Sequence, residues 1–194
     1  MIAHLSGILA STGDRWVVID VGGVGYRVQV TRPALQSLQQ TEGLVRVHTY
    51  MAVRDDDIQL YGFLYPSELE LFRILISVSG IGPQIAMNVL SQISLEDFAI
   101  AIVSDDEKVL TRITGIGQKS ARRLILELKD KMKKHTETVP GGKRTAEAGD
   151  AVSALISLGF SPREAQEAVD AVLSIPDPTV QNLIRGALAR LRER

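Results

Sequence analysis

Apolar and polar residues alternate along the first third of the chain, which is the period expected of half-buried β-strands. Five stretches show this pattern: IAHLSGILA (2–10), WVVIDV (16–21), GYRVQV (25–30), LVRVHTYMAV (44–53) and IQLYGF (58–63). The pair Gly22-Gly23 between the second and third stretches is typical of a short hairpin turn. No helical pattern follows these glycines, so they do not indicate a dinucleotide-binding loop. Five strands within residues 1–63 predict a small closed barrel of the OB-fold type.

From Pro66 the apolar residues recur every three or four positions, which predicts helices. Ser67 is the expected N-cap of the first helix, and Pro83 opens the second. The expected helical segments are SELELFRILISVSG (67–80), the residues after Pro83, SLEDFAIAIVSDD (94–106), EKVLTRITG (107–115) and the run from Gly117 to about Lys134. Residues 64–134 are therefore expected to form an all-helical domain.

Residues 135–150, HTETVPGGKRTAEAGD, have no apolar period and contain Pro, Gly and Thr, which predicts a flexible linker. Three amphipathic segments follow in residues 151–194 and predict a small three-helix bundle. Ser161 and Pro162 are the expected N-cap and first residue of its middle helix. The fold class expected for the whole chain is a multi-domain α+β protein, with a barrel, a helical domain, a linker and a terminal bundle.

The composition is that of an ordinary globular protein, with 45% hydrophobic and 23% charged residues in a chain of 194. No stretch reaches the roughly 18 apolar residues of a membrane span, and no signal-peptide pattern opens the chain. We therefore expect a cytoplasmic protein without a membrane partner. The chain has no Cys and three scattered His, which excludes disulfides, thiolate catalysis and Cys-ligated zinc. We expect neither a metal nor a cofactor.

The net charge of −1 conceals an uneven distribution of charged residues. Residues 64–107 carry one basic side chain against seven acidic ones, whereas residues 108–134 carry nine basic against two acidic. Such an asymmetry indicates a polyanionic partner better than the total charge does. Taken alone, a basic run is more often a solvated helix face, so the charge needs support from a motif.

One motif occurs twice: SGIGPQ at residues 79–84 returns as TGIGQK at residues 114–119. Glycine permits left-handed backbone angles and leaves room for another molecule to approach the backbone. The isoleucine can turn inward as an anchor, while the helix that follows presents its free N–H groups and the positive end of its dipole. Such a site binds phosphate and no base edge, so it would hold a nucleic acid without reading its sequence.

A single Gly-x-Gly turn is more often a plain connection between two packed helices. Two copies in the same context, the second beside Lys119, Arg122 and Arg123, favour phosphate binding instead. The second copy does not indicate a nucleotide-binding loop, because Gln118 stands where the last glycine of that loop is required and no strand precedes the motif.

The turn between the last two predicted strands is acidic, with the sequence Arg54-Asp55-Asp56-Asp57. Aspartate is common in solvated turns, so a structural turn is the simplest interpretation. A nuclease metal site is the second interpretation, although the carboxylates are consecutive and no His or Glu partner is placed nearby. These four residues alone leave both interpretations open.

The paired Gly-Ile-Gly turns resemble tandem helix-hairpin-helix motifs. Their place after a barrel that contains VGGVGY and LYGF, and before a linked three-helix tail, resembles the RuvA family over essentially all 194 residues. Members of that family are the Holliday-junction-binding subunits of the bacterial branch-migration complex. The resemblance implies structure-specific binding of four-way junction DNA in homologous recombination, DNA repair and the SOS response. It also implies a homotetramer, and it allows an octamer on DNA.

The resemblance further implies partners and a division of labour. The tail, which resembles a ubiquitin-associated (UBA) domain, would dock on the RuvB ATPase motor, and RuvC resolvase would be a further partner. The chain has no nucleotide loop and no catalytic Ser/His arrangement, so it would be a non-catalytic subunit of an ATP-dependent helicase complex. Two other classes stay open: a helix-hairpin-helix nuclease or glycosylase that uses the acidic turn, and a protein–protein adaptor built on the tail.

The resemblance places DNA contacts on both turns. The residues that it assigns to DNA binding are Gly80, Ile81, Gly82, Pro83, Gln84, Gly115, Ile116, Gly117, Gln118, Lys119, Arg122 and Arg123. Relatives often carry Lys at the position of Gln84 and a basic residue at that of Gln118, so the resemblance supports backbone contacts there and not charge contacts. Asp55, Asp56 and Asp57 would form the acidic pin of the family, which stands at the junction centre.

The apolar residues of the tail mostly predict the core of its bundle. A bundle of some forty residues cannot hide every apolar side chain, so an exposed apolar patch is expected as a partner site. The residues expected in that patch are Leu158, Phe160, Leu183 and Ile184.

Overall fold

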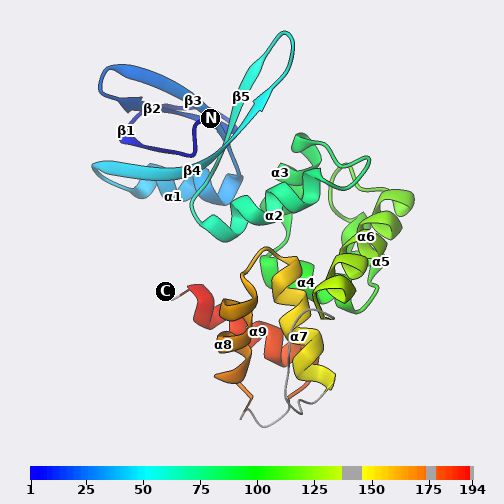
Figure 1. Cartoon of the computed structure of the whole chain (residues 1–194). Coiled ribbons are helices and arrows are strands. Elements are labelled where there is room, and N and C mark those ends of the chain that lie inside the picture. The colour runs from blue at the N-terminus through cyan, green and yellow to red at the C-terminus, as the bar shows by residue number, and fades with distance from the viewer. Residues whose placement is uncertain (137–145, 174–177, 193–194) are drawn as a thin grey trace. The chain divides into compact units, whose positions relative to one another are not determined.

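The computed structural model describes residues 1–136, 146–173 and 178–192 of the chain (Figure 1). These residues form two compact units, Met1–Phe72 and Arg73–Arg194. The first unit contains the strands and the second contains most of the helices.

The first unit is a closed five-stranded barrel, as the alternating pattern predicts (Figure 1). Its strands are β1 (His4–Thr12), β2 (Trp16–Val21), β3 (Val24–Val30), β4 (Leu44–Val53) and β5 (Ile58–Phe63). Their order around the barrel is β1-β2-β3-β5-β4, and β4 pairs with β1 to close it. Neighbouring strands are antiparallel except β3 and β5, which are parallel.

The strand alternation explains the barrel core. Val17 and Ile19 on β2, Val28 on β3 and Val47 on β4 are fully buried. They are β-branched residues, which pack well on a pleated surface. Each pair of buried positions is separated by one residue that points away from the core, so shifting a strand by one residue would expose this apolar set.

Helix α1 (Arg32–Gln40), which joins β3 to β4, was not predicted from the sequence. Its signal is present: the Thr31 hydroxyl accepts a hydrogen bond from the Ala34 N–H at 3.2 Å, and Pro33 stands in the first turn. Ala34 and Leu38, one turn apart, are buried. A helix of nine residues contains too few repeats of the helical period to be recognised from its apolar residues alone, especially between two strong strand patterns.

Five helices follow the last strand along the chain, at the places that the apolar period predicts: α2 (Pro66–Ile76), α3 (Pro83–Gln92), α4 (Leu95–Val103), α5 (Glu107–Thr111) and α6 (Gln118–Thr136). The expectation that Ser67 caps α2 is wrong, because the helix already begins at Pro66. Glu68, in the first turn, reaches back instead and accepts hydrogen bonds from the N–H groups of Leu64 and Tyr65, the two residues before the helix, at 3.0 and 3.2 Å.

The tail contains α7 (Ala146–Ser157), α8 (Pro162–Asp170) and α9 (Val180–Arg192), which pack against one another. The expected linker, residues 135–150, is shorter than predicted at both ends, because α6 continues to Thr136 and α7 begins at Ala146. The rest of it, residues 137–145, lies outside the described residues. The predicted cap of α8 is confirmed, with the Ser161 hydroxyl accepting from the Glu164 N–H at 3.3 Å.

In the described part of the chain, no single helix is long and apolar enough to cross a membrane. Helices α3 and α4 meet the length and composition only when taken together, and they are bent by 104° to each other.

Candidate nucleic-acid interface

The two Gly-Ile-Gly turns have the same backbone geometry. Gly80 precedes α3 and Gly115 precedes α6, with φ angles of +89° and +94°. Only glycine adopts such angles without strain. In each turn the isoleucine N–H donates to a carbonyl three residues earlier, Ile81 to Val78 and Ile116 to Ile113, both at 3.0 Å.

The isoleucines are anchors, as the sequence predicts. Ile81 and Ile116 are 3% and 4% exposed. Because both are buried in the helical core, a ligand on the outer side of either turn would meet the backbone and not these side chains. Their burial also fixes the turn against the helices on either side of it.

The second glycine of each motif has a different reason to be there. A Cβ atom added to Gly82 or Gly117 would meet nothing within 4 Å, and neither residue has a positive φ angle. The fold therefore does not require glycine at either position. What a side chain would block is the space outside the turn, in front of the helix that follows.

The helix starts offer unpaired N–H groups to that space. Gly82 is the N-cap of α3 and provides no side-chain cap, and the first intrahelical bond runs from the Ala86 N–H to the Gly82 carbonyl at 3.0 Å. The Ala121 N–H makes the equivalent bond to the Gly117 carbonyl at 2.9 Å. The N–H groups before these bonds have no partner in the helix, so each start attracts an anion. Pro83 removes one N–H from the first turn.

The three cations expected at the second turn differ in their surroundings. Lys119 is exposed and makes no ion pair with any residue that the structure describes. The Arg122 Nε lies 3.0 Å from a carboxylate oxygen of Glu107, which compensates its charge. Arg123 is exposed but donates from Nη1 to Ser79 at the first turn. Of these three cations, only Arg122 has a carboxylate partner among the described residues, so the charges of Lys119 and Arg123 are not compensated.

Gln84 and Gln118, the uncharged residues near the two helix starts, are both exposed. The Gln84 side chain lies along α3, with its Nε2 3.5 Å from the Asn88 Oδ1. Neither side chain brings a charge to the turns, so the open N–H groups carry the attraction for an anion there.

Asn88 and Gln92, which connect the two turns, were not predicted from the sequence, and Arg123 was predicted only as a DNA ligand. The Asn88 Nδ2 of α3 donates to the Thr114 carbonyl at 2.9 Å, just before Gly115. Gln92 accepts from the Thr114 N–H and hydroxyl at 3.2 and 3.3 Å. In the other direction, the Arg123 Nη1 of α6 donates to the Ser79 carbonyl, just before Gly80, at 3.1 Å. The sequence does contain a signal for two of these residues, because Asn88 and Arg123 occupy equivalent positions after the two copies of the motif.

The acidic turn lies at the end of the β4–β5 hairpin, which projects beyond the other strands of the barrel (Figure 1). The Arg54 N–H donates to the Asp57 carbonyl at 2.8 Å and closes the turn. Asp57 accepts from Gln59 at 2.6 Å, and burial raises the pKa of the Tyr61 phenol behind it, an effect that Arg54 opposes.

Asp55 and Asp56 form the outermost part of this turn. Both are exposed, and neither accepts a hydrogen bond or an ion pair from any residue that the structure describes. The described residues also contain no group of three or more His, Cys, Asp or Glu that could hold a metal ion. The tip therefore presents two uncompensated negative charges to whatever approaches the end of the hairpin.

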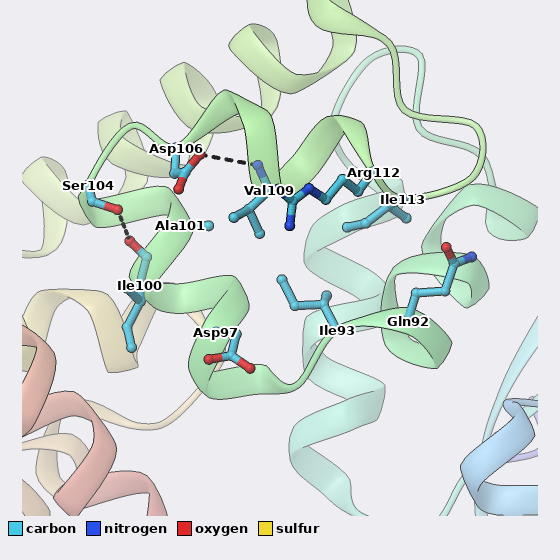
Figure 2. A pocket seen from close by; sticks show the side chains of 10 residues that line it. All are labelled: Gln92, Ile93, Asp97, Ile100, Ala101, Ser104, Asp106, Val109, Arg112 and Ile113. Carbon is cyan, nitrogen blue, oxygen red and sulfur yellow. Dashed lines mark hydrogen bonds between the residues drawn. The ribbon is translucent and has the colours of Figure 1, made fainter.

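An open pocket of about 360 Å³ lies among α3, α4 and α5 (Figure 2). Arg112, which also lines the pocket, is exposed. The other polar lining residues hold helix ends or the second turn: Asp106 accepts from the Val109 N–H, Asp97 accepts from Ser94, Ser104 donates to the Ile100 carbonyl, and Gln92 accepts from Thr114. Because these groups are already committed to the fold, they do not form a convergent set for a substrate.

The tail residues expected to contact a partner are mostly core. Leu158, Leu183 and Ile184 are 3%, 0% and 0% exposed, so the expectation that they form an exposed patch is wrong. In a bundle this small, the apolar period marks the positions that face the neighbouring helices. Phe160 is partly exposed, and of the four it alone retains surface for a partner.

An OB-type barrel followed by two equivalent glycine turns defines a protein of the tandem helix-hairpin-helix class. Three family profiles match the chain: RuvA N terminal domain over residues 1–62, SAM-like Helix-hairpin-helix tandem over 72–130, and RuvA, C-terminal domain over 146–192. The chain belongs to the RuvA family.

Curated relatives agree with the profiles over the full length. The Holliday junction branch migration complex subunit RuvA of Acetivibrio thermocellus is 42% identical over 98% of this chain and 98% of its own. The subunit of the same name from Pseudomonas syringae pv. syringae is 42% identical over 97% of this chain and 98% of its own. That of Prosthecochloris aestuarii is 38% identical over 99% of both chains.

Proposed function

We propose that the protein binds four-way Holliday junction DNA by its structure, as a homotetramer, and holds the junction open and square. It would recruit the RuvB ATPase motor and thereby support branch migration in homologous recombination and DNA repair. The observation that carries the proposal is the pair of equivalent turns, each with a second glycine that the fold does not require and an open helix start behind it.

The turns would bind phosphates of the DNA backbone through main-chain N–H groups. In the first turn these belong to Gln84 and Ile85, and in the second to Gln118, Lys119 and Ser120. The Lys119 ammonium adds a charge contact at the second turn. Since a phosphate site reads no base, the grip would be independent of sequence and would depend on where the DNA backbone runs.

The acidic tip would supply the preference for a junction. Screening by salt limits the electrostatic repulsion from a carboxylate to about 10 Å at 0.1 M salt. Asp55 and Asp56 therefore repel only phosphates that are forced close to them. An open junction keeps its phosphates away from the centre, whereas a continuous duplex must run across it. The tip would thus weaken all binding, and weaken binding of the duplex most, which produces specificity.

The chain would contribute no chemistry of its own to branch migration. We infer that the ATPase belongs to RuvB and that the tail docks there, with Phe160 as the part of the expected patch that still has exposed surface. RuvC resolvase as a further partner, an octamer on DNA, a cytoplasmic location and a role in the SOS response are parts of the same proposal.

The test is a mass measurement by analytical ultracentrifugation, with and without a synthetic four-way junction. We expect four chains in the free protein and four or eight on one junction, together with weaker binding to a duplex of equal length. A monomer that binds both DNAs equally would contradict the proposal. Cleaved strands after incubation with junction and Mg²⁺ alone would instead support a helix-hairpin-helix nuclease.

A further inference from the structure

The two helices that follow the glycine turns carry side chains at equivalent positions. Asn88 stands eight residues after Gly80, and Arg123 stands eight residues after Gly115. Both are therefore the sixth residue of their helix, α3 and α6, and point in the same direction relative to their own turn.

Each of these side chains reaches the other turn. The Asn88 Nδ2 donates to the carbonyl of Thr114, and the Arg123 Nη1 donates to the carbonyl of Ser79, at 2.9 and 3.1 Å. Thr114 and Ser79 are themselves equivalent, since each immediately precedes the first glycine of its motif. The two bonds cross, so each turn is held by the helix that begins at the other turn.

We propose that Asn88 and Arg123 are positioning residues that lock the two phosphate-binding turns into one clamp of fixed spacing. This inference rests on the proposed function, because it assigns both turns to the same arm of the DNA. Two sites held at a fixed spacing bind a matching ligand more tightly than two independent sites, since the second contact needs no further ordering.

The burial of Asn88 indicates that it positions the second turn and does not contact DNA directly. Asn88 is 7% exposed, so it cannot serve as a DNA ligand on the surface. A buried amide without partners is costly, which commits the group to its bonds with neighbouring residues. The turn also packs directly on α3, because a Cβ atom on Gly115 would lie 3.3 Å from the Ile85 Cγ1.

Gln92 strengthens the same connection from one turn further along α3. Its Oε1 accepts hydrogen bonds from both the N–H and the hydroxyl of Thr114. On the other side, the Arg123 Nη1 also lies 3.1 Å from the Ser79 hydroxyl. Guanidinium has five N–H donors, so Arg123 can hold Ser79 and still offer donors to a phosphate.

The experiment compares Asn88→Ala with Ser91→Ala in the full chain. Ser91 is a matched control, because its hydroxyl donates within α3 to the Met87 carbonyl at 2.7 Å and does not touch a turn. Junction affinity is measured by fluorescence anisotropy over a salt series, and amide hydrogen exchange is measured without DNA. The Ile116 N–H, which is hydrogen-bonded inside the second turn, reports on that turn, and the Ile81 N–H reports on the first.

We expect Asn88→Ala to weaken junction binding roughly fivefold, the loss of about one hydrogen bond, without changing the salt slope. Exchange at Ile116 should accelerate more than exchange at Ile81, and Ser91→Ala should change neither quantity. Gln92→Ala, at an exposed position, should give a smaller loss of the same kind and guards against a folding defect in Asn88→Ala.

Unchanged affinity and exchange in both Asn88→Ala and Gln92→Ala would overturn the positioning role. A fall in the salt slope would also overturn it, because that result indicates a lost charge contact. Failure of the proposed function looks different: the unmodified protein would show no preference for the junction, while the exchange experiment would still measure the connection between the turns.

Discussion

Gly80 and Gly82 stand two residues apart in one turn, and the fold requires glycine only at the first of them. Gly80 has a φ angle of +89°, which disfavours any other residue. Gly82 has an ordinary φ angle of −86° and open space where a Cβ atom would lie. The same contrast separates Gly115 from Gly117 in the second turn. The first glycine of each pair allows the positive φ angle of the turn, and the second leaves the outer surface of the turn free of a side chain.

Gly82→Ala and Gly117→Ala should therefore separate stability from binding. We expect the stability of the free protein to be unchanged or to rise by about 0.4–1 kcal/mol, because alanine restricts the unfolded chain. Junction affinity should fall roughly tenfold as the methyl group keeps the phosphate from the N–H groups. Thermal unfolding and fluorescence anisotropy measure the two quantities.

Gly149→Ala is the matched control for these variants. Gly149 lies in α7, and an added Cβ atom there also meets nothing within 4 Å. This variant should gain about 0.5–1 kcal/mol from helix propensity and leave binding unchanged. If Gly82→Ala and Gly117→Ala bind junctions as well as Gly149→Ala does, the second glycines do not face DNA.

Gly80→Ala and Gly115→Ala should behave in the opposite way and damage the fold first. A non-glycine residue in the left-handed region costs about 1–2 kcal/mol. The loss should be larger for Gly115→Ala, because its new methyl group presses on Ile85 at 3.3 Å, whereas the nearest atom to that on Gly80 is an Arg123 nitrogen at 3.9 Å. Equal midpoints in urea unfolding for Gly80→Ala and Gly82→Ala would contradict this division.

Neutralising the tip should improve binding to the wrong DNA. In Asp55→Asn with Asp56→Asn, we expect several-fold tighter binding to plain duplex and a smaller preference for the junction, since the repulsion of phosphate is removed. Asp14→Asn changes the charge at another exposed site of the same unit and should have little effect. The difference between duplex and junction should shrink with added salt. Gel-shift titrations that give the same duplex affinity with and without the two substitutions would rule out the role of the tip.

The barrel and most helices were predictable because their apolar periods are long and uninterrupted. Helix α1 was missed because only Ala34 and Leu38 mark its buried face. The connection between the turns could not be read from the sequence, since it depends on which polar side chain of α3 reaches Thr114 in the folded chain. The two turns could be located from the sequence, but the hydrogen bond from Arg123, in the helix after the second turn, to Ser79 at the first turn could not.

The tail shows a different limit of sequence reasoning. Apolar period identifies positions that face inward, and Leu183 and Ile184 are fully buried for that reason. A partner surface has no such period, because it is formed by whichever apolar side chains are left outside after the helices have packed. Phe160 follows Gly159, at the end of α7, where the helical period no longer decides which side is buried.

The salt dependence of binding should distinguish Lys119 from Arg122. Each charge contact with a phosphate contributes about 0.9 to the slope of log affinity against log salt. Lys119→Ala should lower the slope by about that amount per protomer and weaken binding at every salt concentration. Arg122→Ala should have a smaller effect, because Glu107 already compensates the guanidinium at 3.0 Å. Glu107→Gln removes the carboxylate charge beside Arg122 and should therefore raise the slope. If Glu107→Gln leaves the slope unchanged and Arg122→Ala lowers it as much as Lys119→Ala does, Glu107 does not compensate Arg122 when DNA is bound.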